Sequence, residues 1–215
     1  MLGVSLLCLC ALLATGAAKA QAHQNSVAEL RLRIASSLPG KHRAVPAIVW
    51  LEPLPGTPAL PFNPDGPYTL LQKNRTFTPH LLVIPVGSVV QFPNADPFFH
   101  NVFSLSTAAG PNGFDLGRYP KGESRTVTFE RPGTVQVFCH IHSDMSASVL
   151  VLQNPYFAQP ADDHRYVIDD VPEGDYTIVG WHERAKLVIR RVHVTAGQTS
   201  TVDFNIPVPP AGNGR

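Results

Sequence analysis

The sequence predicts an all-β fold, and three observations lead to this prediction. Charged residues make up only 15% of the chain, so long charged surface helices are not expected. Short stretches in which apolar and polar residues alternate recur along the chain, as in half-buried strands. The 21 prolines and 16 glycines gather between those stretches, where they favour turns. No stretch predicts a helix longer than a couple of turns.

The predicted strands fall into three sections. The first section precedes residues 52–67, whose six prolines and two glycines indicate a linker or loop. The second begins near Leu70, and the third runs from Tyr156. Residues 107–120 are rich in Gly, Pro and Asn and are predicted to be irregular. The strands are expected at residues 27–34, 44–51, 81–85, 88–92, 100–104, 123–130, 135–138, 148–152, 165–169, 176–181, 187–194 and 200–206.

Residues 1–20 have the features of a secretory signal peptide. The apolar stretch from Leu2 to Ala18 is too short for a membrane span, and Ala18-Lys19-Ala20 fits a small-x-small cleavage site. Cleavage at Ala20-Gln21-Ala22 and an uncleaved N-terminal anchor are the alternatives. We therefore expect a periplasmic or secreted protein with no stable membrane insertion after cleavage.

The charge balance argues against nucleic acid as a partner. Removal of Lys19 lowers the number of basic residues from 17 to 16, equal to the number of acidic residues. A net charge of zero supports neither nucleic-acid binding nor a polybasic membrane patch.

Only one cysteine is expected in the mature chain. Cys8 and Cys10 lie in the signal peptide, so Cys139 is left without an internal disulfide partner. An exposed free thiol in an oxidising compartment would be oxidised. Binding to a metal would protect it.

The stretch Val135–Met145 contains the chemistry that would hold such a metal. A β-branched and aromatic run brings Cys139 to the end of a predicted strand, and His142 and Met145 follow at intervals of three residues. A thiolate, an imidazole and a thioether suit copper better than magnesium or calcium, and the thioether argues against structural zinc. With His100 as the fourth ligand, the set predicts one type 1 copper per chain, with Met145 in the axial position.

Two physical requirements of such a site add further expectations. Aromatic side chains should exclude water from the ligands, and one imidazole edge, that of His142, should reach the surface to pass an electron. The candidates for the aromatic shell are Phe98, Phe99, Phe103 and Phe138.

Residues 68–155 resemble the cupredoxins, the plastocyanin and amicyanin group of blue copper proteins. The resemblance implies a Greek-key β-sandwich with the four ligands at one end, and it implies that Asn101 links the His100 segment to the ligand loop. This sequence departs from the family in having Val135 after Pro-Gly-Thr, where tyrosine is common. The matching motifs are Phe77-Thr78-Pro79, the run Val86–Asn94, His100-Asn101-Val102 and Pro132-Gly133-Thr134 before Cys139-x-x-His142-x-x-Met145.

The third section contains the stretches Asp170–Ile178 and Val194–Gln198, and Val45–Leu51 lies in the first section. In these stretches the chain resembles carboxypeptidase regulatory-like (transthyretin-like) domains, with Val45–Leu51 matching the family's early strands. The resemblance implies a second small β-sandwich, discontinuous over residues 26–58 and 156–208, with the cupredoxin inserted as one long loop. Two contiguous domains are the alternative, and residues 209–215 are expected to be a flexible tail.

The leading functional hypothesis is one-electron transfer to a redox protein of unknown identity. The alternatives are a copper store or chaperone, with His80, His140 and His182 adding capacity, and a structural β-sandwich with a vestigial copper site. His80 and His140 are otherwise expected to be surface histidines. An enzyme is not expected, because four protein ligands leave no open position for a substrate.

Overall fold

The computed structural model describes residues 28–34, 46–57, 66–110, 113–160 and 165–207. Within these ranges the chain forms strands and one short 3-10 helix, η1 (Thr107–Ala109), which confirms the predicted all-β fold. The strands are β1 (Ala28–Ile34), β2 (Ile48–Pro53), β3 (Tyr68–Thr69), β4 (Leu71–Lys73), β5 (Thr76–Thr78), β6 (Leu81–Pro85), β7 (Ser88–Pro93), β8 (His100–Ser104), β9 (Phe114–Tyr119), β10 (Ser124–Phe129), β11 (Gly133–Phe138), β12 (Ser146–Leu152), β13 (Phe157–Ala158), β14 (Arg165–Val171), β15 (Gly174–Trp181), β16 (Val188–Val194) and β17 (Thr199–Phe204).

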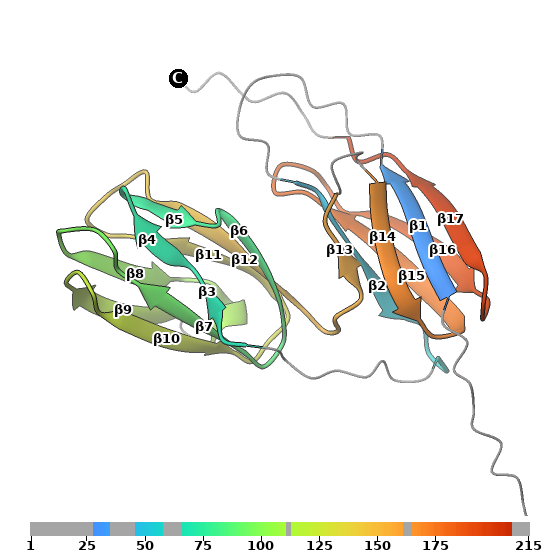
Figure 1. Cartoon of the computed structure of the whole chain (residues 1–215), viewed down its shortest axis with the longest axis horizontal. Coiled ribbons are helices and arrows are strands. Elements are labelled where there is room, and N and C mark those ends of the chain that lie inside the picture. The colour runs from blue at the N-terminus through green and yellow to red at the C-terminus, as the bar shows by residue number, and fades with distance from the viewer. Residues whose placement is uncertain (1–27, 35–45, 58–65, 111–112, 161–164, 208–215) are drawn as a thin grey trace, which may run out of the picture.

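Strands β3 to β12 form the middle unit, which is green to yellow in Figure 1. One sheet has the strand order β6-β12-β11-β8-β9, the other has the order β10-β7-β3, and β4 and β5 form a separate hairpin. Fully buried side chains such as Val90, Phe92, Phe129, Val135 and Val149 fill the space between the sheets. Their alternation along each strand produces a sandwich with one apolar interior.

The remaining strands form the flanking unit, which combines the two ends of the described chain (Figure 1). Its sheets have the orders β14-β1-β17 and β13-β2-β15-β16. Strand β2 is antiparallel to β15 from Ile48–Trp181 to Pro53–Tyr176, and β1 lies between β14 and β17. Strands that precede the middle unit in sequence therefore pair with strands that follow it.

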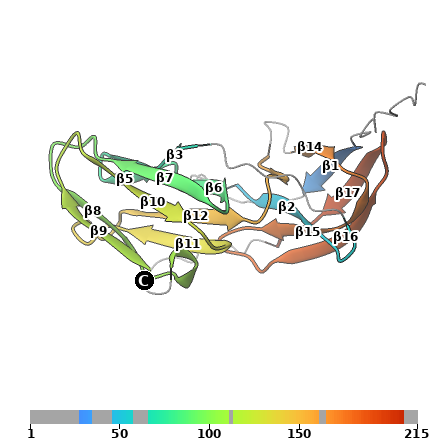
Figure 2. The same ribbon diagram turned by 90° about the horizontal axis from the view of Figure 1, so that it is seen from below.

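A separate cluster of buried apolar side chains lies between the two units and joins them. Side chains of β6 and β12 in the middle unit pack against side chains of β2 and β15 in the flanking unit, and Figure 2 shows these strands meeting near the centre of the molecule. Because these side chains are buried, the two units share a hydrophobic core at their junction. The cluster consists of Ile48, Trp50, Leu81, Val83, Leu150, Leu152, Val179 and Trp181.

The prediction that residues 107–120 are irregular was wrong for half of that segment. Strand β9 occupies Phe114–Tyr119 and pairs with β8, with His100 opposite Tyr119 and Ser104 opposite Phe114. The predicted signal peptide, with Cys8 and Cys10, and the predicted tail at 209–215 lie outside the described residues. In the part of the chain that is described, no helix has the length and hydrophobicity needed to span a membrane.

Candidate metal centre

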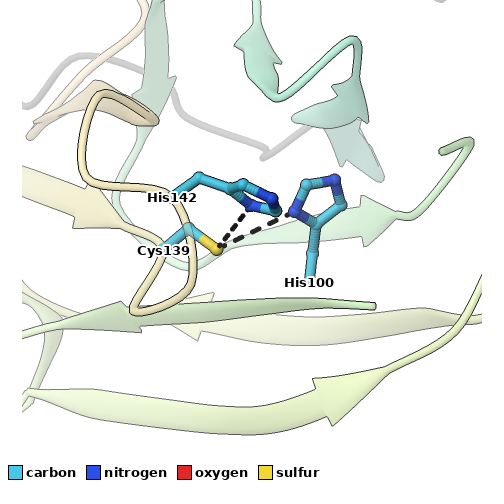
Figure 3. Close-up of side chains that lie close together, drawn as sticks. All are labelled: His100, Cys139 and His142. Carbon is cyan, nitrogen blue, oxygen red and sulfur yellow. Dashed lines mark hydrogen bonds between the residues drawn. The ribbon is translucent and has the colours of Figure 1, made fainter. Parts of the chain in front are cut away.

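Three predicted ligands meet at one end of the middle unit. The Sγ atom of Cys139 lies 3.8 Å from Nδ1 of His100 and 3.8 Å from Nδ1 of His142 (Figure 3). One donor atom from each residue lies within 4.8 Å of the others. His100 is fully buried and Cys139 is only 5% exposed, whereas His142 is partly exposed. The cluster therefore has a closed interior and one imidazole that reaches solvent.

Two local structures bring these residues together. His100 is the first residue of β8, and Cys139 directly follows β11, which pairs with β8. Beyond Cys139 the chain turns back on itself. The Met145 N–H donates to the His142 carbonyl, and the Cys139 N–H donates to the Met145 carbonyl. These hydrogen bonds fix the loop that carries His142.

The spacing of the three donor atoms fits a shared metal ion. Sulfur and nitrogen ligands lie about 2.3 Å and 2.0 Å from a zinc ion, so two donors on one ion are at most about 4.3 Å apart. Both sulfur-to-nitrogen distances, 3.8 Å, fall within that limit. Among the described residues Cys139 is a free, buried cysteine, so its thiol is available as a metal ligand.

The other two predicted site residues lie beside this cluster. Met145 is 1% exposed and belongs to the same buried cluster as Cys139. The Oδ1 atom of Asn101 accepts the backbone N–H of His140 at 3.2 Å, and its Nδ2 donates to Asp115 at 2.6 Å. Asn101 thus joins β8 to both the ligand loop and β9.

The predicted aromatic shell is only partly present. The ring centroid of Phe98 lies 5.2 Å from that of His100 and 5.5 Å from that of His142. Phe99 was expected to exclude water but is 55% exposed, since it precedes β8 on the outer surface. Phe103 stacks on His140 at 3.6 Å, and Phe138 packs against Phe103. The aromatic contact with the ligand imidazoles therefore comes from Phe98.

His142 forms part of a shallow surface depression. Phe98, Phe99, Ile141 and Arg118 line the same depression. Burial lowers the pKa of the His142 imidazole, and its electrostatic interactions with the neighbouring His100 and Arg75 lower it further. The shift favours the neutral imidazole, which is the form that binds a metal.

Sequence reasoning missed Asp96, which lies in the 94–97 loop and was given no role. Its Oδ2 atom is 2.8 Å from Nε2 of His100, on the side of the ring away from Cys139, and the residue is 4% exposed. Burial raises the pKa of Asp96, but the backbone N–H groups of Arg75 and Asn74 and the His100 ring outweigh it, so the net shift is downward. The only signal in the sequence was an acid four residues before a candidate ligand.

The remaining histidines that were considered do not join the cluster. His80 lies between the two units, where its Nε2 is 3.5 Å from Oε2 of Glu183. The buried His182 accepts the N–H of Arg184 at its Nδ1. The His140 side chain is 54% exposed, as expected for a surface histidine. Within the described ranges, His100, Cys139 and His142 are the one group of residues placed to hold a metal.

Comparison with known proteins found similarity among solved structures alone. No protein-family model matches the chain, and no curated protein matches it. A reduced mutant of amicyanin is 24% identical, with 41% of this chain and 84% of that chain covered and a TM-score of 0.39. The reduced state of another amicyanin mutant is 21% identical, with 48% and 99% covered and a TM-score of 0.38. The matched region is less than half of this chain.

Proposed function

We propose that this chain is an exported type 1 copper protein that transfers single electrons. The observation that carries the proposal is the buried thiol of Cys139, which has two imidazole nitrogens, one from His100 and one from His142, at 3.8 Å. A copper ion bound there supplies one-electron chemistry between Cu(I) and Cu(II). The protein supplies a ligand set that needs little movement when the charge changes.

The donor types favour copper over the other common metals. One thiolate with two imidazoles and a weak axial thioether is the ligand set of blue-copper sites, whereas structural zinc sites take four strong ligands. We propose Met145 as the axial ligand because it is buried in the same cluster and closes the ligand loop through its backbone. Asn101 would hold the loop against β8 by accepting the His140 N–H.

The position of His142 supports electron transfer. Its ring is partly exposed within a depression that has Phe98, Phe99 and Ile141 on its walls. A mostly apolar surface around an exposed ligand edge, with Arg118 as the charged residue in its lining, allows a redox protein to approach closely at a small desolvation cost. We propose that the redox partner docks there, and that the chain is not an enzyme because four protein ligands leave no open position.

We also propose that the flanking unit is a discontinuous carboxypeptidase regulatory-like domain over residues 26–58 and 156–208, into which the copper domain (68–155) is inserted. The pairing of β2 with β15, and of β1 with β14 and β17, supports the insertion. Because β13 pairs with β2, the chain returns to the flanking unit close to the place where it left that unit, as an inserted domain requires. Export is supported by the signal-like residues 1–20.

Copper titration of the mature protein tests the proposal. We expect one copper per chain, an intense blue Cu(II) form with narrow hyperfine splitting, and reversible one-electron reduction. Cys139→Ser should abolish the colour, and Ser143→Ala, an exposed change in the same loop, should retain it. A colourless copper complex of the wild-type protein would contradict the proposal, and binding of several coppers per chain would favour a store or chaperone instead.

A further inference from the structure

The outer nitrogen of His100 has its own buried partner. The Nδ1 atom faces Cys139, and the opposite ring nitrogen, Nε2, lies 2.8 Å from Oδ2 of Asp96. The side-chain exposures are 0% for His100 and 6% for Asp96, so water does not weaken this contact. An ionised carboxylate can only accept hydrogen bonds, so the proton between these atoms must be on Nε2 of the imidazole.

Asp96 is itself held in place by the backbone. Its Oδ1 accepts the N–H of Asn74 at 2.7 Å, and its Oδ2 accepts the N–H of Arg75 at 2.9 Å. Asn74 and Arg75 form the turn of the β4–β5 hairpin and have φ values of 55° and 57°, the conformation that points both N–H groups to one side. Three donors converge on one carboxylate, which favours its charged form.

The loop around Asp96 is also fixed. The buried Asn94 accepts the Asp96 N–H at 2.9 Å and donates to the carbonyls of Phe98 and Tyr119 at 2.9 and 3.1 Å. The carboxylate therefore cannot move away from His100 without breaking contacts to the hairpin and to β9. A buried histidine–aspartate pair that only stabilised the fold would not need its free nitrogen to face a thiol.

We propose that Asp96 is a positioning residue that prepares His100 for copper. This inference rests on the copper site proposed above. By accepting a hydrogen bond from the Nε2–H group, Asp96 holds the ring so that Nδ1 faces Cys139 and the site, and such a partner also makes the imidazole a stronger donor. The negative charge of Asp96, fixed in a dry environment, stabilises Cu(II) more than Cu(I), because Cu(II) carries the larger positive charge.

Replacement of Asp96 by Asn is the first test, because the side chain keeps its shape and loses its charge. We expect the affinity for Cu(II), relative to Cu(I), to fall about tenfold, which raises the reduction potential by about 59 mV for one electron. Asp144→Asn is the matched control, since it removes the same charge from an exposed position in the ligand loop. The potential of that variant should stay close to the wild-type value.

An unchanged potential in Asp96→Asn, or equal shifts in the two variants, would mean that Asp96 has no specific action on His100. The melting temperature of each copper-free variant shows whether the fold is retained.

A second measurement needs neither copper nor a variant. A long-range proton–nitrogen NMR correlation spectrum of the copper-free wild-type protein should show His100 with its proton on Nε2. A neutral His100 ring with its proton on Nδ1 and none on Nε2 would overturn the inference. Because this readout is independent of metal binding, a protein that bound no copper would refute the proposed function while the NMR result still decided the role of Asp96.

Discussion

The hydroxyl group of Tyr119 provides a sharp test of the structure behind the metal centre. Tyr119 ends β9 directly opposite His100 and is fully buried. Its hydroxyl donates to the Phe92 carbonyl at 2.8 Å and accepts from Nε2 of Gln72 at 2.6 Å. Tyr119→Phe removes both hydrogen bonds and leaves the ring in place.

The size of the effect follows from these two contacts. Each neutral hydrogen bond contributes about 1 kcal/mol net, and a buried donor left without a partner costs about 1–3 kcal/mol. Gln72 also donates to the Phe92 carbonyl at 3.0 Å, which limits the damage. We therefore expect Tyr119→Phe to lower the free energy of unfolding by about 2 kcal/mol.

The pH dependence gives this prediction a second, independent part. Burial raises the pKa of Tyr119 to about 12, above the unfolded value of about 10. The stabilisation that the neutral Tyr119 hydroxyl gives the folded state is therefore complete below about pH 10. It is lost as the pH rises towards about 12, because Tyr119 ionises at a lower pH in the unfolded chain. Two pKa units correspond to about 2.7 kcal/mol, so the difference between wild type and Tyr119→Phe should shrink to near zero over this range.

Denaturant unfolding of the copper-free proteins at neutral pH and at about pH 11 measures both parts. Tyr176→Phe is the comparison, since the Tyr176 hydroxyl donates a hydrogen bond of 2.8 Å to the Pro172 carbonyl in the flanking unit. Its cost should be nearer 1 kcal/mol. A Tyr119→Phe effect below about 0.5 kcal/mol at neutral pH, or one that did not change with pH, would refute the reasoning.

Three further predictions follow from local geometry. A Cβ atom on Gly113 would lie 1.9 Å from a carbonyl oxygen of β8, whereas one on Gly117 would meet nothing within 4 Å. Gly113→Ala should therefore lower the free energy of unfolding, measured with denaturant, by about 1–3 kcal/mol more than Gly117→Ala does. Leu152→Ala, in the cluster between the units, should lower the free energy of unfolding by about 2–5 kcal/mol. Val89→Ala, at a residue that is 39% exposed, should lower it far less, and equal effects would contradict a shared core. Copper at 100 times its Kd should stabilise the wild type by about 2.7 kcal/mol in thermal unfolding and leave Cys139→Ser unchanged.

The local sequence was sufficient for most strands. The apolar stretches and the turn residues between them predicted β6 and β8 at their observed bounds and β16 to within one residue. The prediction failed at β9, whose sequence contains Gly117 and half of whose residues are exposed. Strand β9 is extended because the preceding strand, β8, supplies its hydrogen-bond partners, and such pairing leaves no mark on the composition of the segment.

The sequence by itself determined the chemistry of the candidate site. The types and spacing of Cys139, His142 and Met145 predicted a soft metal site, because ligand preference depends on donor atoms that can be read directly. The tertiary structure decided which distant groups meet them. His100, 39 residues before Cys139, reaches the thiol through the pairing of β8 with β11, and Asp96 reaches His100 because a hairpin turn holds its carboxylate. Contacts of this kind depend on how the strands pack, which one-dimensional patterns do not contain.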